Sequence, residues 1–353
     1  MKILVIQNKM IGDVLASSSI CNTLKNEYPE AQIDYLIYTF TNPVVENNPN
    51  IDDIILFTDK IKNSKIELLK FCFKIRKSKY DAVVDAYGKL ESNLMVSFSG
   101  AKMKIGFYKS YTNLIYTHTF KEHSVPETSA GLALENRMLL LQPFSLKKPL
   151  KIKPEIFLKE SEIENGKQIL TENNIDFSKK IYMIGVLGSG TTKTYPGKYM
   201  AELLDKIVSN TDATLLFNYI PSQLKEAQEI FNLCEPNTQK NIKIDIVPKT
   251  IREFLSITHH CDALIGNEGG AVNMAKALNK PTFTIFSTWI KKEAWNSFDD
   301  GIKNVSVHLK DFKPELYGIK SAKEMKKQAM DLYKAFSPDL IIPDLEKYLK
   351  ANN

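Results

Sequence analysis

The sequence contains no run of apolar residues long enough to cross a membrane, since a spanning helix needs about 18 to 20 of them. Its first stretch, MKILVIQNKMIGDVL, has too short an apolar run for a signal peptide and no small-residue cleavage site. Lysines are spread along the chain, and the net charge of +6 is modest for 353 residues. This charge distribution argues against a nucleic-acid-binding protein. It is compatible with binding to an anionic substrate or to an anionic membrane surface.

The chain contains few cysteines, and their spacing in the sequence forms no paired motif. The four cysteines, Cys21, Cys72, Cys234 and Cys261, lie far apart and form no C-x-x-C motif. Three fall in predicted helices and Cys261 precedes a predicted strand. We expect buried, reduced thiols in a cytoplasmic protein.

Motifs for metals and for the common nucleotide sites are also missing. There is no D-x-D triplet, and the only close histidines, His259 and His260, are adjacent and suggest packing or surface exposure. No Walker A loop occurs, and Gly188-Ser189-Gly190 does not continue into G-x-G-x-x-G. We therefore expect no metal, and a site unlike that of an ATPase or a dehydrogenase.

What the sequence does contain is a repeated order of strand and helix. Hydrophobic residues make up 43% and charged residues 25%, which is typical of a globular protein with enough apolar material for two cores. Strands are expected at 2–7, 33–38, 53–57, 82–85, 102–107, 180–187, 213–218, 243–247, 263–265 and 282–286. Helices are expected at 13–28, before Asn47, and at 65–77, 129–141, 161–173, from Pro196, at 222–233, 251–258, 271–278 and 338–349. This alternation predicts an α/β fold with parallel sheets covered by helices.

The segment 142–157 contains three prolines and no helical period, and it marks the expected domain boundary. We predict two Rossmann-like domains, 1–150 and 151–335, that face one another across a cleft. The last segment, 336–353, is predicted as a helix that packs back toward the N-terminal domain. Ligands of open parallel sheets lie at the carboxyl ends of the strands. The loops expected to matter are 7–13, 187–194, 218–223, 247–250 and 266–270.

Three of these loops carry chemistry. Asp13, at the start of a helix, is either an N-cap or a general base positioned by Gly12. The stretch LGSGTTKTYP, 187–196, gathers hydroxyls, glycine N–H groups and one lysine before a helix, as a phosphate cradle does. In 262–278, DALIGNEGGAVNMAKAL, a strand leads through Gly269 and Gly270 into a helix whose N-terminus favours anions or sugar oxygens. An ordinary strand–turn–helix connection would also need these glycines.

Together these pieces resemble the glycosyltransferase family 9 enzymes, the ADP-heptose:lipopolysaccharide heptosyltransferases of Gram-negative bacteria. The resemblance lies in KILVIQNKMIGDVL, in the TTKTYP region, and in NEGGAVNMAKAL followed by Lys280-Pro281, in the correct order over both halves. It implies the GT-B fold, with the acceptor on the N-terminal domain and the nucleotide sugar on the C-terminal domain. It also implies inverting transfer without a D-x-D-bound metal and without a cofactor.

The resemblance assigns roles to particular residues. Asp13 matches the catalytic base and Lys193 the lysine that contacts the donor phosphates. The implied donor-binding residues are Gly12, Ser189, Thr191, Thr192, Gln223, Thr250, Glu268, Gly269, Gly270 and Asn273. Lys9, Lys102, Lys104 and Lys109 are candidates for binding a phosphorylated, lipid-linked acceptor, although solvated loop lysines would look the same.

The sequence departs from the family at 268–273. Typical members have an aspartate, a small hydroxyl residue, a glycine and, three positions later, a histidine, where this chain has Glu268, Gly269, Gly270 and Asn273. The donor sugar could therefore differ from heptose, and asparagine carries no positive charge for a phosphate.

Two alternatives remain open, a GT-B-like nucleotide-sugar epimerase and a non-catalytic sugar-nucleotide-binding protein. The expected partners of the transferase are a nucleotide sugar and a lipid-linked glycan. We expect a cytoplasmic monomer, with peripheral contact with the inner membrane and no nucleic acid.

Overall fold

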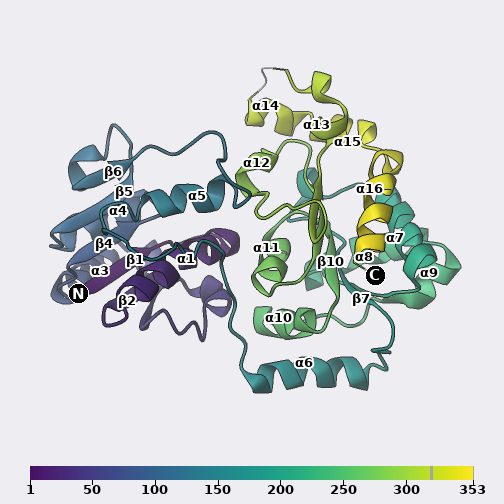
Figure 1. Cartoon of the computed structure of the whole chain (residues 1–353), viewed down its shortest axis with the longest axis horizontal. Coiled ribbons are helices and arrows are strands. Elements are labelled where there is room, and N and C mark those ends of the chain that lie inside the picture. The colour runs from purple at the N-terminus through teal and green to yellow at the C-terminus, as the bar shows by residue number, and fades with distance from the viewer. Residues whose placement is uncertain (319–320, 353) are drawn as a thin grey trace. The chain divides into compact units, whose positions relative to one another are not determined.

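The computed structural model describes residues 1–318 and 321–352 (Figure 1). It divides into two compact units, Met1–Phe157 and Leu158–Asn353. Among the described residues, each unit is built around one six-stranded sheet whose paired strands all run parallel. The predicted α/β class with two parallel-sheet domains is confirmed, while the cleft between the domains stays a prediction. The division follows Phe157, where the sequence had suggested 150.

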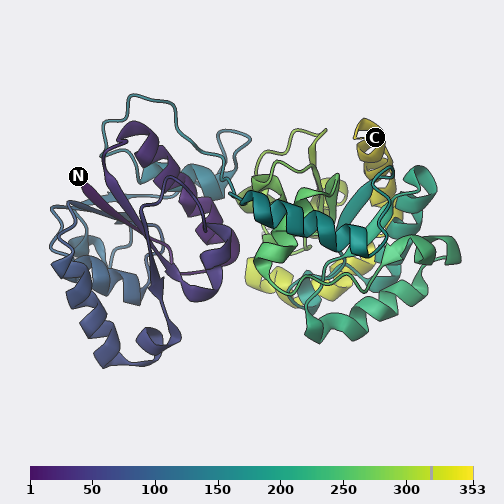
Figure 2. The same ribbon diagram turned by 90° about the horizontal axis from the view of Figure 1, so that it is seen from below.

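The first unit has the strand order β3-β2-β1-β4-β5-β6, and its helices lie on both sides of the sheet (Figure 2). Its strands are β1 (Lys2–Ile6), β2 (Gln32–Tyr38), β3 (Asp53–Phe57), β4 (Ala82–Asp85), β5 (Met103–Phe107) and β6 (His118–Phe120). Its helices are α1 (Ile11–Glu27), α2 (Asp59–Asn63), α3 (Lys65–Lys77), α4 (Leu90–Phe98) and α5 (Leu132–Leu139), with 3-10 turns η1 (Thr39–Val44) and η2 (Asn113–Ile115).

Burial on both faces explains the apolar run of β1. Leu4 and Ile6 pack with the side chains of α3 and α4 in one core, and because strand side chains alternate, Ile3 and Val5 point to the opposite face. All four are fully buried. Continuous apolar sequence is typical of a central parallel strand covered on both sides.

The second unit has the order β12-β11-β10-β7-β8-β9. Its strands are β7 (Ile181–Gly185), β8 (Thr214–Phe217), β9 (Ile242–Lys243), β10 (Ala263–Asn267), β11 (Thr282–Ile285) and β12 (Asn304–Val307). Its helices are α6 (Glu160–Glu172), α7 (Gly197–Thr211), α8 (Leu224–Leu233), α9 (Pro236–Asn241), α10 (Ile251–His259), α11 (Gly270–Ala277), α12 (Lys292–Trp295), α13 (Leu309–Phe312), α14 (Ala322–Lys327), α15 (Ala329–Ala335) and α16 (Pro338–Ala351), with 3-10 turns η3 (Thr191–Lys193), η4 (Pro221–Gln223) and η5 (Pro314–Leu316).

The C-terminal helix α16 belongs to the second unit and lies against α7 (Figure 1). That 336–353 packs back toward the N-terminal domain stays a prediction. Ile341, Leu345 and Tyr348 of α16 are buried in the core of that unit. Their spacing of three to four residues forms an apolar stripe, which that core buries.

Several elements differ from the sequence prediction. The helix expected before Asn47 is the 3-10 turn η1, which contains Pro43, and a proline removes a backbone donor from any longer helix. The strand expected at 243–247 is reduced to the two residues of β9. Both β6 and β12 were missed, as was α4. In the described part of the chain, no helix has the length and apolar composition needed to span a bilayer.

In each sheet the strand order reverses at one point, and parallel sheets bind ligands at the carboxyl ends of the strands beside such a reversal. The reversal lies between β1 and β4 in the first unit and between β7 and β10 in the second. Asp13 lies in the first turn of α1, the helix after β1, and the segments after β7 and β10 carry Lys193 and Glu268. Topology alone therefore directs attention to these residues.

Candidate active site

Asp13 lies in the first turn of α1, and both of its carboxylate oxygens have partners. Oδ2 accepts a hydrogen bond from the backbone N–H of Met10 (3.1 Å), as a capping residue does. Oδ1 accepts from Nη2 of Arg137 (2.7 Å). The side chain is 31% exposed. Asp13 therefore caps its helix and also presents a fixed, accessible carboxylate, so the two interpretations of this residue are compatible.

The sequence analysis did not identify Arg137 as a partner of Asp13. It comes from α5, which packs against α1. Its Nε donates to Ser17 Oγ (2.7 Å) and its Nη1 to the carbonyl of Ala133 (2.5 Å), so the planar guanidinium is held while it contacts Asp13. Arg137 and Asp13 are 124 residues apart in the sequence, and no local sequence pattern predicts their contact.

The acceptor candidates do not all lie with Asp13. Lys9 follows β1, and its ammonium group lies 5.0 Å from the ring centroid of Tyr38. Lys109 follows β5, and its Nζ donates to the carbonyl of Gly88 (2.5 Å), in the loop after β4. Lys102 precedes β5 and Lys104 is its second residue. These two lie toward the amino end of the strand, away from the carboxyl edge that holds Asp13.

The phosphate-cradle loop of the second unit closes on itself. The backbone N–H of Gly188 donates to Thr194 Oγ1 (3.1 Å), and that hydroxyl donates to the carbonyl of Gly190 (3.0 Å). A Cβ on Gly188 would lie 2.1 Å from the carbonyl oxygen of Lys193, so only glycine fits there. Ser189 and Thr191 are exposed on this loop.

Lys193 points toward the turn after β10. Its Nζ lies 3.4 Å from Glu268 Oε1, and 5.6 Å from the ring centroid of Trp289. Glu268 is largely buried and also accepts a hydrogen bond from Ser287 Oγ (2.9 Å). The indole Nε1 of Trp289 donates to the carbonyl of Thr192 (2.8 Å). Loops after three neighbouring strands, β7, β10 and β11, thus converge on one cation.

Asn267, the last residue of β10, holds these loops in place. Its Nδ2 donates to the carbonyls of Gly185 (2.9 Å) and Val186 (3.0 Å), and its Oδ1 accepts from the backbone N–H of Tyr195 (2.7 Å). The side chain is buried. One amide therefore joins the end of β7, the end of β10 and the start of α7.

The glycine turn takes the form that the sequence indicated. Gly269 has φ +151° and open space at its Cβ position, and it precedes α11, whose first N–H groups face the turn. Gly270 is the first residue of α11, and Asn273 is half-buried in its first turn. The turn can therefore receive an anion or sugar oxygens beside Lys193.

Gln223 and Thr250 have structural contacts of their own. Gln223 Nε2 donates to the carbonyl of Gly188 (2.9 Å), and its Oε1 accepts from the N–H of Ile220 (3.2 Å). Gln223 therefore ties the 218–223 loop to the phosphate-cradle loop. Thr250 is the N-cap of α10 and accepts from the N–H of Glu253 (3.1 Å).

The metal and cysteine predictions bear on the chemistry of the site. In residues 1–318 and 321–352, no group of three or more His, Cys, Asp and Glu side chains is arranged to hold a metal ion. His260 Nε2 lies 2.8 Å from the carbonyl of Ile163, as a packing residue does. All four cysteines are buried and free, as predicted.

Comparison with known proteins shows the family to which the chain belongs. The family model described as "Glycosyltransferase family 9 (heptosyltransferase)" matches residues 68–316. Lipopolysaccharide heptosyltransferase 1 of Campylobacter coli is 27% identical over 293 residues, which cover 81% of this chain and 84% of that protein.

Two solved structures share the fold over nearly the whole chain. The family 9 glycosyl transferase of Veillonella parvula superposes with a TM-score of 0.77 at 14% identity, covering 99% of this chain and 97% of that one. The ADP-heptose lipopolysaccharide heptosyltransferase II of Escherichia coli gives 0.68 at 18% identity, with 95% and 99% covered.

Proposed function

Because the chain belongs to glycosyltransferase family 9, we propose that it transfers a heptose or a related sugar from a nucleotide-diphosphate donor to a glycan acceptor of the lipopolysaccharide or lipooligosaccharide type. The proposed donor is ADP-heptose. The observation that carries the proposal is the convergence of Lys193, Glu268 and Trp289 beside the N-terminus of α11.

In this proposal, the second unit binds the nucleotide-sugar donor and stabilises its leaving group. Lys193 and the first N–H groups of α11 stabilise the negative charge that develops on the departing diphosphate. Glu268 is an acceptor of hydrogen bonds, so it suits sugar hydroxyls rather than phosphate oxygens. Ser189 and Thr191 offer exposed hydroxyls to the phosphates. In this mechanism the positive charge comes from these groups, and no metal ion is required.

The acceptor half falls to the first unit. Asp13 removes the proton from the acceptor hydroxyl as that oxygen attacks the anomeric carbon in line with the leaving diphosphate, which inverts the configuration. Arg137 and the Met10 N–H hold the carboxylate in one orientation, and each carboxylate oxygen keeps a further lone pair for the incoming hydroxyl.

The carboxyl edge of the first sheet suits a lipid-linked, anionic acceptor. Lys9 and Lys109 lie there with the exposed side chains of Met10, Leu90 and Tyr111, which follow β1, β4 and β5. Cations interleaved with apolar and tyrosine side chains favour a phosphorylated lipid headgroup at a membrane surface. We include peripheral contact with the cytoplasmic face of the inner membrane in the proposal.

The test replaces the base and keeps the donor site. Asp13→Asn should bind nucleotide sugar as the wild type does, in isothermal titration calorimetry, and lose transfer by a factor of about 10² to 10⁴. Asp52→Asn is the matched control, because Asp52 is 35% exposed, pairs with Lys25 in the same unit and also accepts a backbone N–H. Unchanged transfer by Asp13→Asn would refute the assignment of the base. Donor binding without any transfer by the wild type would favour a non-catalytic binding protein.

A further inference from the structure

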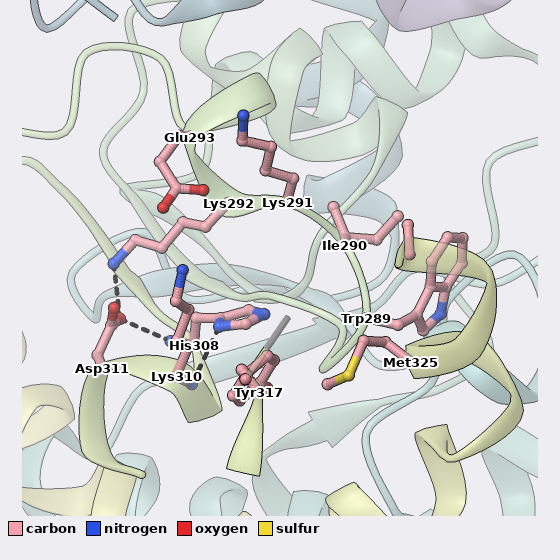
Figure 3. Close-up of a pocket in the computed structure, with 12 residues that line it drawn as sticks. Trp289, Ile290, Lys291, Lys292, Glu293, His308, Lys310, Asp311, Tyr317 and Met325 are labelled. Carbon is pink, nitrogen blue, oxygen red and sulfur yellow. Dashed lines mark hydrogen bonds and ion pairs between the residues drawn. The ribbon is translucent and has the colours of Figure 1, made fainter. Parts of the chain in front are cut away.

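A cavity lies in the second unit at the carboxyl ends of β11 and β12 (Figure 3). We name it the Trp289 pocket. It has a volume of about 260 Å³ and is formed by the loop after β11, α12, the end of β12, α13, Tyr317 and α14. None of the predicted site residues lines it, and Trp289 links it to the candidate site through its contact with Lys193.

His308 is the buried polar group that points into this pocket (Figure 3). Only 3% of it is exposed. Its Nδ1 accepts a hydrogen bond from the backbone N–H of Lys310 (3.1 Å), and burial lowers the pKa of the ring, opposed by Asp311. The neutral ring must therefore carry its hydrogen on Nε2. The Ser287 backbone acts in the opposite direction and raises the pKa of His308, yet no described protein group lies in hydrogen-bonding geometry with Nε2.

Tyr317 supplies a second unsatisfied group in the same wall. Its hydroxyl is buried and has no hydrogen-bond partner within the described residues. Its ring packs on His308, with centroids 5.4 Å apart. Most buried polar atoms in folded proteins are paired, so two neighbouring exceptions in one pocket indicate a polar ligand.

The other walls combine apolar and charged side chains, and the charged ones are Lys291, Lys292, Glu293, Lys310 and Asp311. Trp289, Ile290 and Met325 line the pocket opposite the histidine (Figure 3). A flat indole with aliphatic neighbours suits the C–H face of a sugar ring, and an imidazole N–H and a phenol hydroxyl suit its hydroxyl groups. The volume lies below the range of about 300–1,000 Å³ for drug-sized ligands, and it suits one monosaccharide rather than a nucleotide.

The pocket is within reach of a donor held at Lys193. Trp289 belongs to both places, because its ring lies near the Lys193 ammonium group and also lines the pocket. Glu268, Ser287 and His308 follow the neighbouring strands β10, β11 and β12. Two strand spacings amount to about 10 Å, which one pyranose ring and its bond to a phosphate can cover.

We propose that the Trp289 pocket receives the glycosyl group of the nucleotide-sugar donor, with His308 and Tyr317 as its hydrogen-bonding partners and Trp289 as its apolar platform. This inference rests on the proposed function. It gives a physical reason for the departures at Glu268 and Asn273, because part of the sugar recognition then lies on β11 and β12 instead of on α11.

The decisive variant is Tyr317→Phe, which removes one hydroxyl and keeps the ring. Since that hydroxyl is unpaired, its loss should not lower the melting temperature of the free protein. The affinity for the preferred nucleotide sugar, chosen from ADP-, GDP-, UDP- and CMP-sugars, should fall about three- to tenfold. The affinity for the corresponding nucleoside diphosphate should not change. Isothermal titration calorimetry measures both constants.

Two further variants make the result specific. Tyr348→Phe also removes a buried, unpaired hydroxyl, but from the core of the unit beside Phe283, so it should leave both affinities unchanged. His308→Asn removes the ring and keeps a side chain that caps α13, because asparagine is a favoured N-cap. It should weaken nucleotide-sugar binding without weakening nucleoside-diphosphate binding.

The outcomes separate the two proposals. If Tyr317→Phe and His308→Asn both bind the nucleotide sugar as the wild type does, the pocket assignment is wrong while the proposed function stands. If the wild type binds no nucleotide sugar at all, the proposed function itself fails. If free monosaccharide binds with the same dependence on Tyr317 while nucleotide sugars do not, the pocket serves another sugar and the donor assignment is overturned.

Discussion

The contact between Arg137 and Asp13 leads to the most specific prediction, for the substitution Arg137→Lys. Arginine donates from Nε, Nη1 and Nη2 in three fixed directions, to Ser17, Ala133 and Asp13. Lysine keeps the positive charge but offers one nitrogen on a flexible stem. It can replace the contact with Asp13 or the contact with Ser17, and it cannot hold both in the observed geometry.

The magnitude follows from the hydrogen bonds lost. Two bonds from a charged donor to neutral oxygens are worth about 1.5–3 kcal/mol each when buried. Arg137 is 10% exposed and Asp13 31% exposed, so solvent screens the ion pair itself. We therefore expect α1 and α5 to lose about 2–4 kcal/mol of opening free energy. A carboxylate that is no longer fixed should lower kcat about tenfold or more.

Hydrogen exchange resolves the effect by segment. The two units need not unfold as one cooperative system, so the peptides covering α1 and α5 are compared with those covering α7 and α10, which act as an internal reference. Arg76→Lys is the control, because Arg76 is exposed on α3. The affinity for nucleotide sugar should not change.

A wild-type kcat in Arg137→Lys, together with the expected loss of protection, would show that Arg137 only stabilises the fold. If Arg137→Lys kept both the wild-type kcat and the wild-type protection of α1 and α5 against hydrogen exchange, the reasoning from the hydrogen bonds would be refuted. A fall in donor affinity without a fall in kcat would contradict the separation of roles between the two units.

Two further predictions concern the second unit. Asn267→Asp places a carboxylate against the carbonyls of Gly185 and Val186, so urea denaturation should show a loss of about 3–5 kcal/mol, whereas Asn210→Asp on the exposed surface of α7 should change little. Burial lowers the pKa of Lys276 to about 8, below its value in the unfolded chain. The buried ammonium group therefore destabilises the fold by its full amount below pH 8. This destabilisation disappears as pH rises toward about 10.5, where the unfolded chain also loses the proton. Lys276→Met should remove this dependence, and the stability difference between variant and wild type should shrink by about 3 kcal/mol between pH 7 and pH 10.5; a constant difference across that range would contradict it.

The central strands were predictable because burial on both faces leaves a continuous apolar run, as in β1 and β7. Short edge elements were not. β12 has four residues and β6 has three, and too few side chains alternate there to form a pattern. Pro43 is visible in the sequence, yet the length of the turn that it permits depends on packing.

The candidate site was predictable only where its residues are local. The phosphate-cradle loop and the glycine turn each lie within one stretch of sequence. Arg137 approaches Asp13, and Trp289 approaches Thr192, only after the chain has folded. Trp289 gave one usable signal, since it is one of two tryptophans and it follows a strand at the ligand-binding edge. Nothing comparable distinguishes His308.

Asn267 separates the frame of the site from the side chains that recognise the ligand. Its three hydrogen bonds all go to main-chain atoms, so the course of the backbone around Lys193 does not depend on which side chains stand at 268 or 273. Replacements at those two positions can accumulate without shifting the loops that carry them. A transferase built in this way can change the sugar that it accepts one residue at a time, and each intermediate sequence still folds to the same site.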